Sequence, residues 1–557
     1  MRVFIIFVLV VFSYADYSKQ FINQWKNILH IDNKKFKQDS FYLSYPYVSW
    51  RNELILNLER IKKQDKMFIC SFPYRYIYLS KYFKLPKIDI FKTCPKLKEF
   101  YDSFQKEKLG IVFSSEYSMS PQSAFGHVML IFKDTNKPLL TADVVHFAAV
   151  VKKEGFFKYS YNGLTGKFPA FYIKEKLFKK YYLYNMIQQR SMFVYWLNFD
   201  KKEIENLILH LYELKKFKAN YYFLNYNCST ATIEALSAVR PSNQYNKIII
   251  LPIKSVILYK KNVKNIQTIL PLDKEIVLLY KKMNFKEKKI FNEIVKMKYL
   301  GNYKTLPNIT KEAIVKFYQY MFYSKKIVYP NYNEVVKLKY KKEKLDTKKI
   351  KDPLQETMPS EIFLFYNSND NSFLFSFRPF LIDKYDLQNK LLEEKQYSVF
   401  APTFYWKKNH FKLEKFDFMN SVSIVKNYSF IKDISWKLYL GLNRENYKRK
   451  LSFEFETGIG NTHPFFKGMF NWLLNLGFDV GHINQLYLKP EINFMYYFSN
   501  NFKIGDIFYY KIFSNTKIYY MNETFLSKEI TYNLKVILSL INTTKNRKIL
   551  IGLGYNF

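Results

Sequence analysis

The C-terminal part of the sequence, residues 359–557, alternates apolar and polar residues in segments of roughly ten residues. In the segment 451–456, for example, Leu451, Phe453 and Phe455 alternate with a serine and two glutamates. A period of two over such lengths indicates β-strands with one apolar face. The pattern predicts roughly ten to twelve strands, and single-chain bacterial barrels have an even number. We therefore predict an antiparallel transmembrane β-barrel; a soluble β-sandwich is the alternative.

The last predicted strand ends the chain on an aromatic residue. Its alternate apolar positions are Ile549, Ile551, Leu553, Tyr555 and Phe557. This ending resembles the Phe-terminated last strand of outer-membrane barrels. The resemblance implies insertion into the outer membrane by the barrel-assembly machinery.

Three regions with other patterns precede the barrel. Residues 16–105 mix short aromatic segments with a helical stretch, 51–63, and are predicted to form a small leading domain. Residues 106–255 combine strand-like runs with a helical period over 203–216, which predicts an α+β domain. Residues 256–358 are rich in lysine and are predicted to form a largely helical connector.

Residues 1–15 have the parts of a secretory signal peptide. A positively charged start is followed by an apolar run over 3–12 and by a small-x-small cleavage site that ends at Ala15. The apolar run is shorter than the roughly 20 residues that a bilayer requires. We therefore expect a mature chain that begins at Asp16, crosses the inner membrane and becomes a periplasm-facing outer-membrane protein.

The composition is strongly basic and aromatic. Lysine and arginine outnumber aspartate and glutamate by 88 to 47, and there are 49 tyrosines and 54 phenylalanines. The excess charge could attract anionic partners such as lipid headgroups. We favour another explanation, because an AT-rich genome would enrich the same residue types and the lysines are spread over the whole chain. No basic module with interleaved aromatics is visible, so no nucleic-acid partner is expected.

The three cysteines divide into a pair and a single residue. In an oxidising periplasm, Cys70 and Cys94 are expected to form a disulfide. Cys228 is then left over, and a leftover thiol in a secreted protein is either buried and inert or reactive. No two histidines or cysteines have the spacing of metal ligands, and we expect neither a metal nor a cofactor.

Cys228 is a candidate nucleophile because a short helix is predicted to begin there. The helix N-terminus would lower the pKa of the thiol and leave the backbone N–H of Cys228 free to point at an oxyanion. Asn227 or Ser229 could cap the helix or add a hydrogen-bond donor.

Two of the seven histidines lie in the predicted strands of the same domain and are candidate bases. His127 follows Gly126, a small residue that allows close approach of another segment. His146 lies on the next strand, where it could orient the first imidazole as the third member of a triad, or merely fill the site. Because a lone buried cysteine or histidine is more often structural, spacing alone favours the non-catalytic interpretation.

Residues 111–241 resemble the Lnb N-terminal periplasmic domain family, which is named after a bacterial lipoprotein N-acyltransferase. The motifs that carry the resemblance are, in chain order, Ser123-Ala124-Phe125-Gly126-His127, Leu139-Leu140-Thr141, Phe147-Ala148-Ala149, Gly163-Leu164-Thr165-Gly166 with Pro169, Tyr221-Tyr222-Phe223-Leu224, Asn227-Cys228-Ser229 and Arg240-Pro241. The leading cysteine segments and the barrel-like end are also similar to the flanking parts of Gram-negative members. The family is in turn similar to circularly permuted papain-like enzymes of the NlpC and lecithin:retinol acyltransferase kind.

For residues 106–255 the resemblance implies a permuted papain-like fold with a thiolate on Cys228 and His127 as its base. Asn227, Ser229 and Ser123 are the candidates for supporting the oxyanion. His146 stands where relatives often have asparagine.

The implied activity is transfer or hydrolysis of an acyl group of a phospholipid or lipoprotein, through an acyl-enzyme on Cys228. An apolar groove would suit such a substrate, and the aromatic residues at 156–157 and 168–172 either line one or fill the core. One alternative is a cysteine amidase or peptidase of peptidoglycan, which the same fold permits. Another is a non-catalytic outer-membrane protein that binds or gates.

Overall fold

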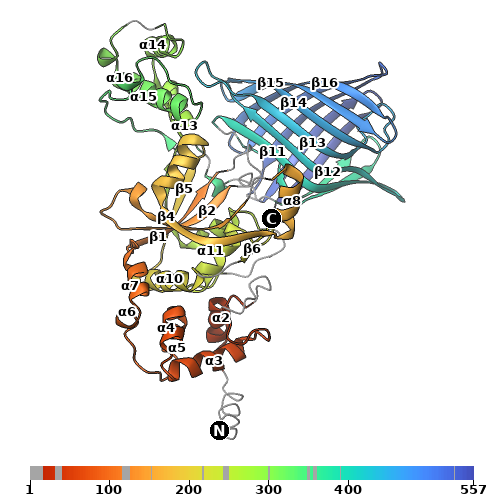
Figure 1. The fold of residues 1–557 in the computed structure, drawn as a ribbon. Coiled ribbons are helices and arrows are strands. Elements are labelled where there is room, and N and C mark those ends of the chain that lie inside the picture. Colours follow the sequence, from red (N-terminus) through yellow and green to blue (C-terminus); the bar gives the residue numbers. More distant parts are fainter. Residues whose placement is uncertain are drawn as a thin grey trace. The chain divides into compact units, whose positions relative to one another are not determined.

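The computed structural model describes residues 17–31, 41–115, 126–151, 154–215, 219–242, 250–298, 301–347, 350, 352–355, 360–388, 391–531 and 533–556 (Figure 1). The predicted signal peptide, 1–15, the candidate support residue Ser123 and the terminal Phe557 lie outside these residues. The chain forms two compact units, residues 1–271 and 272–557. Among the described residues, no helix is both long and apolar enough to cross a membrane.

Short helices form the first part of unit 1. They are α2 (Lys19–Ile28), α3 (Trp50–Lys62), α4 (Lys66–Ser71), α5 (Pro73–Leu79), α6 (Ile90–Thr93) and α7 (Pro95–Asp102). The predicted helix 51–63 is α3, which begins at Ser49 because the serine side chain accepts the Asn52 N–H. The expected disulfide between Cys70 and Cys94 is present, with Cα atoms 5.5 Å apart, and it joins α4 to the start of α7.

A seven-stranded antiparallel sheet forms the second part of unit 1. In spatial order its strands are β6 (Ala219–Tyr221), β4 (Phe168–Lys176), β3 (Asp143–Ala149), β2 (His127–Lys133), β1 (Lys108–Ser114), β5 (Met192–Leu197) and β7 (Val263–Ile269). The central strands β1 and β2 are buried along almost their whole length. Helix α11 (Cys228–Ser237) packs against β2 and β3, and α10 (Lys201–Leu214) contacts β1. The mixed α and β architecture is confirmed, whereas the papain-like permutation stays a prediction.

The edge strand β7 lies in the segment predicted to be a helical connector. It pairs with β5 from Met192 opposite Ile269 to Leu197 opposite Val263. Because β7 is an edge strand, its middle residues are exposed, and its sequence lacks the continuous apolar run of a buried strand. Before β7, the segment holds only the end of helix α12 (Lys254–Leu258) and the 3-10 turn η5 (Lys260–Asn262); its other helices follow β7, in unit 2.

Four helices open unit 2: α13 (Leu272–Lys282), α14 (Phe285–Val295), α15 (Asn308–Tyr323) and α16 (Tyr332–Val335). Helices α13 and α14 pack against the loop that joins two barrel strands, β12 (His410–Val425) and β13 (Ser435–Asn443), and α15 packs against α13 and α14. The Phe430 ring in that loop lies 4.7 Å from the Tyr280 ring and 5.2 Å from the Phe291 ring. These helices are therefore part of the same compact unit as the barrel.

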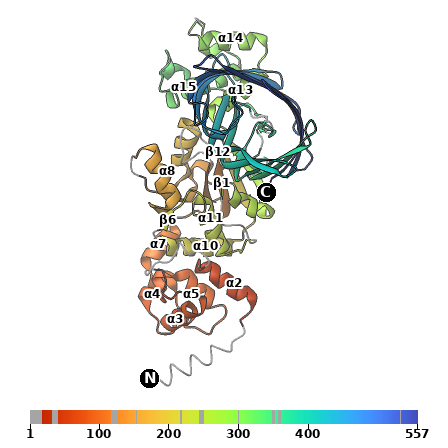
Figure 2. The ribbon, with the colours of Figure 1, turned by 90° about the vertical axis from the view of Figure 1, so that its right-hand side faces the viewer.

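The remainder of unit 2 is a closed antiparallel barrel of twelve strands (Figure 2). The strands are β8 (Glu361–Asn367), β9 (Ser372–Arg378), β11 (Glu393–Lys407), β12, β13, β14 (Ser452–Phe465), β15 (Gly468–Val480), β16 (Gln485–Ser499), β17 (Phe502–Phe513), β18 (Ile518–Glu529), β19 (Leu534–Thr543) and β20 (Arg547–Asn556). Closure is made by β20 pairing with β8 and by β9 pairing with β11. The short strand β10 (Phe380–Ile382) pairs with β11 beside β9. The predicted barrel is confirmed, because the strands close into one ring and do not form the two stacked sheets of a β-sandwich.

The two faces of the barrel wall differ in polarity. On β15, Phe470, Trp472 and Leu474 point outward and are exposed, whereas the alternate residues Asn471 and Asn475 are buried in the lumen. An apolar exterior around a polar interior is typical of outer-membrane barrels. The polar positions, which a soluble protein would expose, are therefore the buried ones here.

Candidate active site

Cys228 is the first residue of α11, and the side chain of Asn227 holds that helix start in place. Its Oδ1 accepts the N–H groups of Ser229 and Thr230, at 2.9 and 3.4 Å. Its Nδ2 donates to the carbonyls of Phe223 and Ile250, at 3.1 and 2.6 Å. Asn227 is therefore an N-cap whose amide is already occupied, and it positions Cys228 without facing a substrate.

Ser229 also has a structural contact. Its Oγ accepts the Ser255 N–H at 3.1 Å, and the residue is fully buried. Of the three candidate oxyanion supports, Asn227 and Ser229 thus hold the helix start, and Ser123 lies outside the described residues.

The backbone N–H of Cys228, which was expected to be free, donates to the hydroxyl of Tyr221 at 3.3 Å. The tyrosine belongs to β6, which pairs with β4 at the edge of the sheet. Because Tyr221 accepts this N–H, its own hydroxyl proton remains to be donated elsewhere. Burial raises the pKa of Tyr221 well above its usual value, so the phenol keeps that proton.

The thiol itself differs from the expectation of a lowered pKa. Only 1% of Cys228 is exposed, and burial raises the pKa of its thiol. Hydrogen bonds from the Val128 backbone and from Tyr221 favour the thiolate but do not outweigh the loss of hydration. The site therefore holds a neutral thiol at neutral pH.

His127 and His146 form a hydrogen-bonded relay with a glutamate that the sequence analysis did not single out. His127 Nε2 lies 3.4 Å from His146 Nδ1, and His146 Nε2 lies 2.8 Å from Glu175 Oε1. Lys180 Nζ lies 2.9 Å from the same glutamate oxygen. With a carboxylate at one end, His146 donates from Nε2 and accepts at Nδ1, so His127 donates from Nε2. The Nδ1 of His127 is then left unprotonated and basic.

The electrostatics of the relay keep both imidazoles neutral. Burial lowers the pKa of His127 well below its usual value, and His146, Arg190 and Lys180 lower it further. Burial also lowers the pKa of His146, although Glu175 opposes this. The hydrogen bond from His146 holds the pKa of Glu175 at about 2. At neutral pH the relay is therefore a carboxylate followed by two neutral rings.

The thiol and the relay meet at the start of β2. The Val128 N–H, which hydrogen-bonds the Cys228 thiol, directly follows His127 in the chain. The Tyr184 ring lies 6.0 Å from the His127 ring, and Tyr184 also interacts with Cys228. Within the described residues no group of His, Cys, Asp or Glu is placed to hold a metal ion.

Sequence reasoning did not identify Glu175, Tyr184 or Tyr221. Glu175 lies on the same face of the sheet as His146, because His146 pairs with Ile173 and strand alternation places Glu175 on the face of Ile173; the sequence does not display this pairing. Tyr221 stands in a quoted motif but had no assigned role. Phe168, which was considered for a groove, is buried against Tyr159 and Phe223 and fills the core instead.

The pH dependence of thiol alkylation tests the neutral thiol. Because burial raises the pKa of Cys228, we expect its alkylation by iodoacetamide to be still accelerating at about pH 9, above the ordinary cysteine pKa of about 8.5. The other two cysteines form the disulfide, so mass spectrometry of the Cys228 peptide gives the rate directly. The urea-unfolded chain is the reference. A rate that is already constant below pH 7 would show a preformed thiolate and contradict the prediction.

Comparisons with known proteins agree with this division of the chain. Residues 96–262 match the Lnb N-terminal periplasmic domain, and residues 361–540 match a domain of unknown function, DUF7840. No curated protein matches the sequence. Among solved structures, a KdgM porin is 11% identical, with a TM-score of 0.23, over 36% of this chain and 98% of its own. A mutant of the Rh. blastica porin is 8% identical, with a TM-score of 0.17, over 36% of this chain and 98% of its own.

The two halves of the chain are consistent with one cellular setting, because a periplasmic domain and an outer-membrane-type barrel both belong to the bacterial envelope. The protein therefore joins residues 96–262, which match the Lnb N-terminal periplasmic domain, to a closed β-barrel of twelve strands.

Proposed function

We propose that the chain is an envelope thiol enzyme that transfers or hydrolyses the acyl group of a phospholipid or lipoprotein through an acyl-enzyme on Cys228. The observation that carries this proposal is the placement of a helix-start thiol near the start of β2, where the neutral imidazole of His127 is linked through His146 to the Glu175 carboxylate. A neutral thiol requires a base at the moment of attack, and His127 is the basic group at that place.

In the first half-reaction, Cys228 Sγ bonds to the ester carbonyl carbon while its proton passes to His127. The carbonyl electron pair moves to the oxygen, where the Tyr221 hydroxyl proton is the candidate donor, because the Cys228 N–H already donates to the Tyr221 oxygen. The tetrahedral intermediate expels the alcohol, which takes the proton from His127 and leaves a thioester. An amine or water then attacks the thioester carbon and gives its proton to His127, the C–S bond breaks, and the released Cys228 sulfur takes the proton from His127.

An exposed apolar patch beside the relay favours a membrane lipid as the acyl donor. Helix α9 (Leu177–Lys180) continues into the π-helix η4 (Tyr181–Ile187), which buries Tyr184 at the site. The same segment exposes Phe178, Tyr182 and Leu183, and Leu140 is exposed on the turn that α9 contacts. Apolar residues flanked by lysines such as Lys179 suit the headgroup region of an anionic membrane.

Trapping the acyl-enzyme tests this proposal. The purified full chain is incubated with a diacyl phospholipid or a diacylated lipopeptide, quenched in acid and digested. We expect the Cys228 peptide to gain the mass of one fatty acyl group, and hydroxylamine at neutral pH to remove it, because thioesters react with this nucleophile. No acyl adduct with either donor would contradict the proposal. An adduct formed instead from peptidoglycan fragments would establish the amidase alternative.

A further inference from the structure

The segment between β10 and β11 folds into the barrel instead of forming an external turn. After Ile382 at the end of β10, residues 383–388 are largely buried, with Tyr385 and Asp386 at 6% and 2% exposure. The connection between β17 and β18, by contrast, is an exposed turn around Thr516. The buried segment therefore packs against other parts of the barrel.

Tyr385 shows where the segment lies. Its hydroxyl donates to Glu523 Oε1 at 2.6 Å, its carbonyl accepts from Ser527 Oγ at 2.7 Å, and its ring lies 5.0 Å from that of Phe525. Glu523, Phe525 and Ser527 occupy alternate positions of β18 and are buried, so they share the lumen face of that strand. Tyr385 therefore lies inside the lumen.

Two aspartates tie the same segment to further strands. Asp386 Oδ1 lies 2.6 Å from Lys535 Nζ on β19, and the Asp386 carbonyl accepts from Lys503 Nζ of β17 at 2.5 Å. Asp383 pairs with Arg378 at 2.6 Å and with Lys535 at 3.6 Å. Buried carboxylates without such partners would be strongly destabilising, so these ion pairs hold the segment in its inward position.

The contacts reach across the full width of the barrel. The segment leaves the wall beside β11, and five strands separate β11 from β17 in either direction round the ring. A second contact crosses at the same end, where the Tyr497 hydroxyl of β16 donates to Glu394 of β11 at 2.5 Å. Both contacts lie at the end of the barrel where β8 begins and β20 ends.

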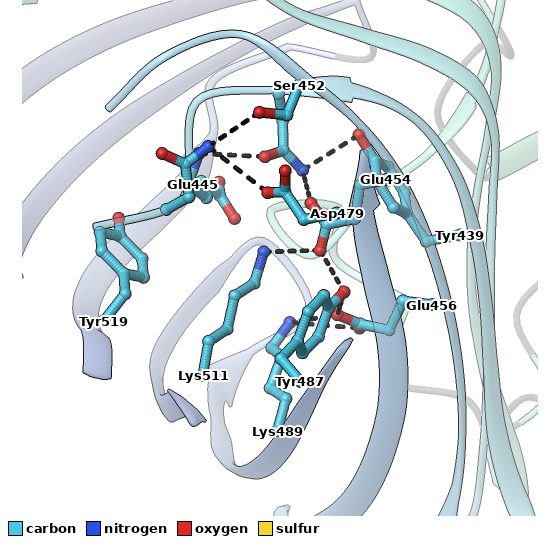
Figure 3. Close-up of polar contacts among 12 residues, drawn as sticks. Tyr439, Glu445, Ser452, Glu454, Glu456, Asp479, Tyr487, Lys489, Lys511 and Tyr519 are labelled. Carbon is cyan, nitrogen blue, oxygen red and sulfur yellow. Dashed lines mark hydrogen bonds and ion pairs between the residues drawn. The ribbon is translucent and has the colours of Figure 1, made fainter. Parts of the chain in front are cut away.

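A cavity inside the barrel, lined by charged and apolar side chains, has this segment as part of its lining. The cavity measures about 300 Å³ and is lined by Asp383, Lys384 and Tyr385 together with charged residues of the wall. Of the wall residues in this lining, Lys489 lies 3.2 Å from Glu456; Glu454 and Lys511, 2.5 Å apart, are buried in the wall outside the lining (Figure 3). Beyond the segment, the lumen thus keeps space for small polar molecules.

We propose that residues 383–388 are a plug that seals the barrel at the end where β8 begins and β20 ends, so that the barrel is a closed anchor and not an open diffusion pore. The proposal is independent of the thiol chemistry. In this proposal Asp383 and Asp386 hold the plug through their ion pairs with Arg378 and Lys535, and loss of the two negative charges releases it.

Conductance across a planar bilayer tests the plug. The full chain, with its incorporation verified by flotation of proteoliposomes, is expected to give no steady open-pore current. The double variant Asp383→Asn/Asp386→Asn is expected to give stepwise currents, because its ties to Lys535 and Arg378 are weakened. The matched control is Asp506→Asn, which removes a carboxylate from the outward face of β17 and should stay silent. Open-pore currents from the unaltered chain would overturn the proposal.

Thiol labelling in detergent covers the case in which the double variant fails to fold. In a Cys228→Ser background, a cysteine introduced by Tyr385→Cys should react with a charged thiosulfonate far more slowly than one introduced by Thr516→Cys in the exposed turn. Adding the two aspartate substitutions should accelerate the reaction at position 385 by roughly tenfold or more. Equal rates at the two positions in the otherwise unaltered barrel would show that the plug is not seated and would sink the proposal.

Discussion

Replacing Cys228 by alanine is expected to abolish acyl transfer and hydrolysis by the purified chain, with a loss of about 10³-fold or more. The loss is expected to be this large because Sγ is the atom that would carry the acyl group, and the chain's other two cysteines form a disulfide. Turnover is measured by mass spectrometry of the released lyso-lipid and of the acylated acceptor.

Two further variants separate chemistry from folding. Cys228→Ser keeps a small polar side chain under the Val128 N–H but supplies a poorer nucleophile, and it should be nearly as inactive. Ser80→Ala, at the end of α5 and far along the chain from the site, should retain full turnover. Normal turnover by Cys228→Ala would contradict the acyl-enzyme on Cys228, whereas no turnover by the unaltered chain would favour the binding or gating alternative.

The barrel could be predicted from the sequence because its signal repeats in every strand. Each strand carries the alternation seen at Phe453 and Phe455, so errors at single positions did not change the conclusion. Which set of residues faces the lumen follows only from closure of the ring, since alternation does not specify inside and outside. The inward fold of residues 383–388 was not predictable either. Its hydrogen-bond and ion-pair partners lie on strands far away in the sequence.

The active-site candidates were predicted in part. Cys228 at a helix start, with His127 and His146 on neighbouring strands, followed from motif and periodicity. The relay to Glu175 depends on the register between β3 and β4, which the sequence does not display. The direction of the thiol pKa shift was expected wrongly. A helix N-terminus favours a thiolate, but at this position burial has the larger effect.

A buried ionic network in unit 1 connects the leading helices to the elements that carry the candidate site. The Arg75 guanidinium is fully buried between the rings of Phe41 and Phe72, at 4.3 and 4.0 Å, and its Nη1 lies 3.6 Å from Glu53. The backbone N–H groups of Tyr74 and Arg75 donate to Glu213 of α10 at 2.8 and 2.9 Å. The network thus joins the leading helices to the helices around the sheet.

The network continues to the helix that carries the thiol. Glu213 contacts His210 at 2.9 Å, His210 contacts His30 at 2.9 Å, and His30 lies 3.4 Å from Glu234. Glu234 belongs to α11, whose first residue is Cys228. Through His30, the leading region therefore contacts α11, the helix that carries Cys228, by polar groups that are costly to leave unpaired.

Arg75→Met is accordingly expected to lower the free energy of unfolding of unit 1 by about 3–5 kcal/mol, because it leaves the buried Glu53 carboxylate without its cation. Hydrogen exchange of peptides from α5, α10 and α11 in the full chain gives this free energy without interference from the barrel. Lys63→Met, which breaks an exposed pair with Glu59, is the matched control and should have little effect. Adding Glu53→Gln to Arg75→Met removes the orphaned charge and should recover part of the loss. If Arg75→Met alone exchanged as slowly as the unaltered chain, the network would not stabilise unit 1, and α11 would owe its position to apolar packing on β2 and β3.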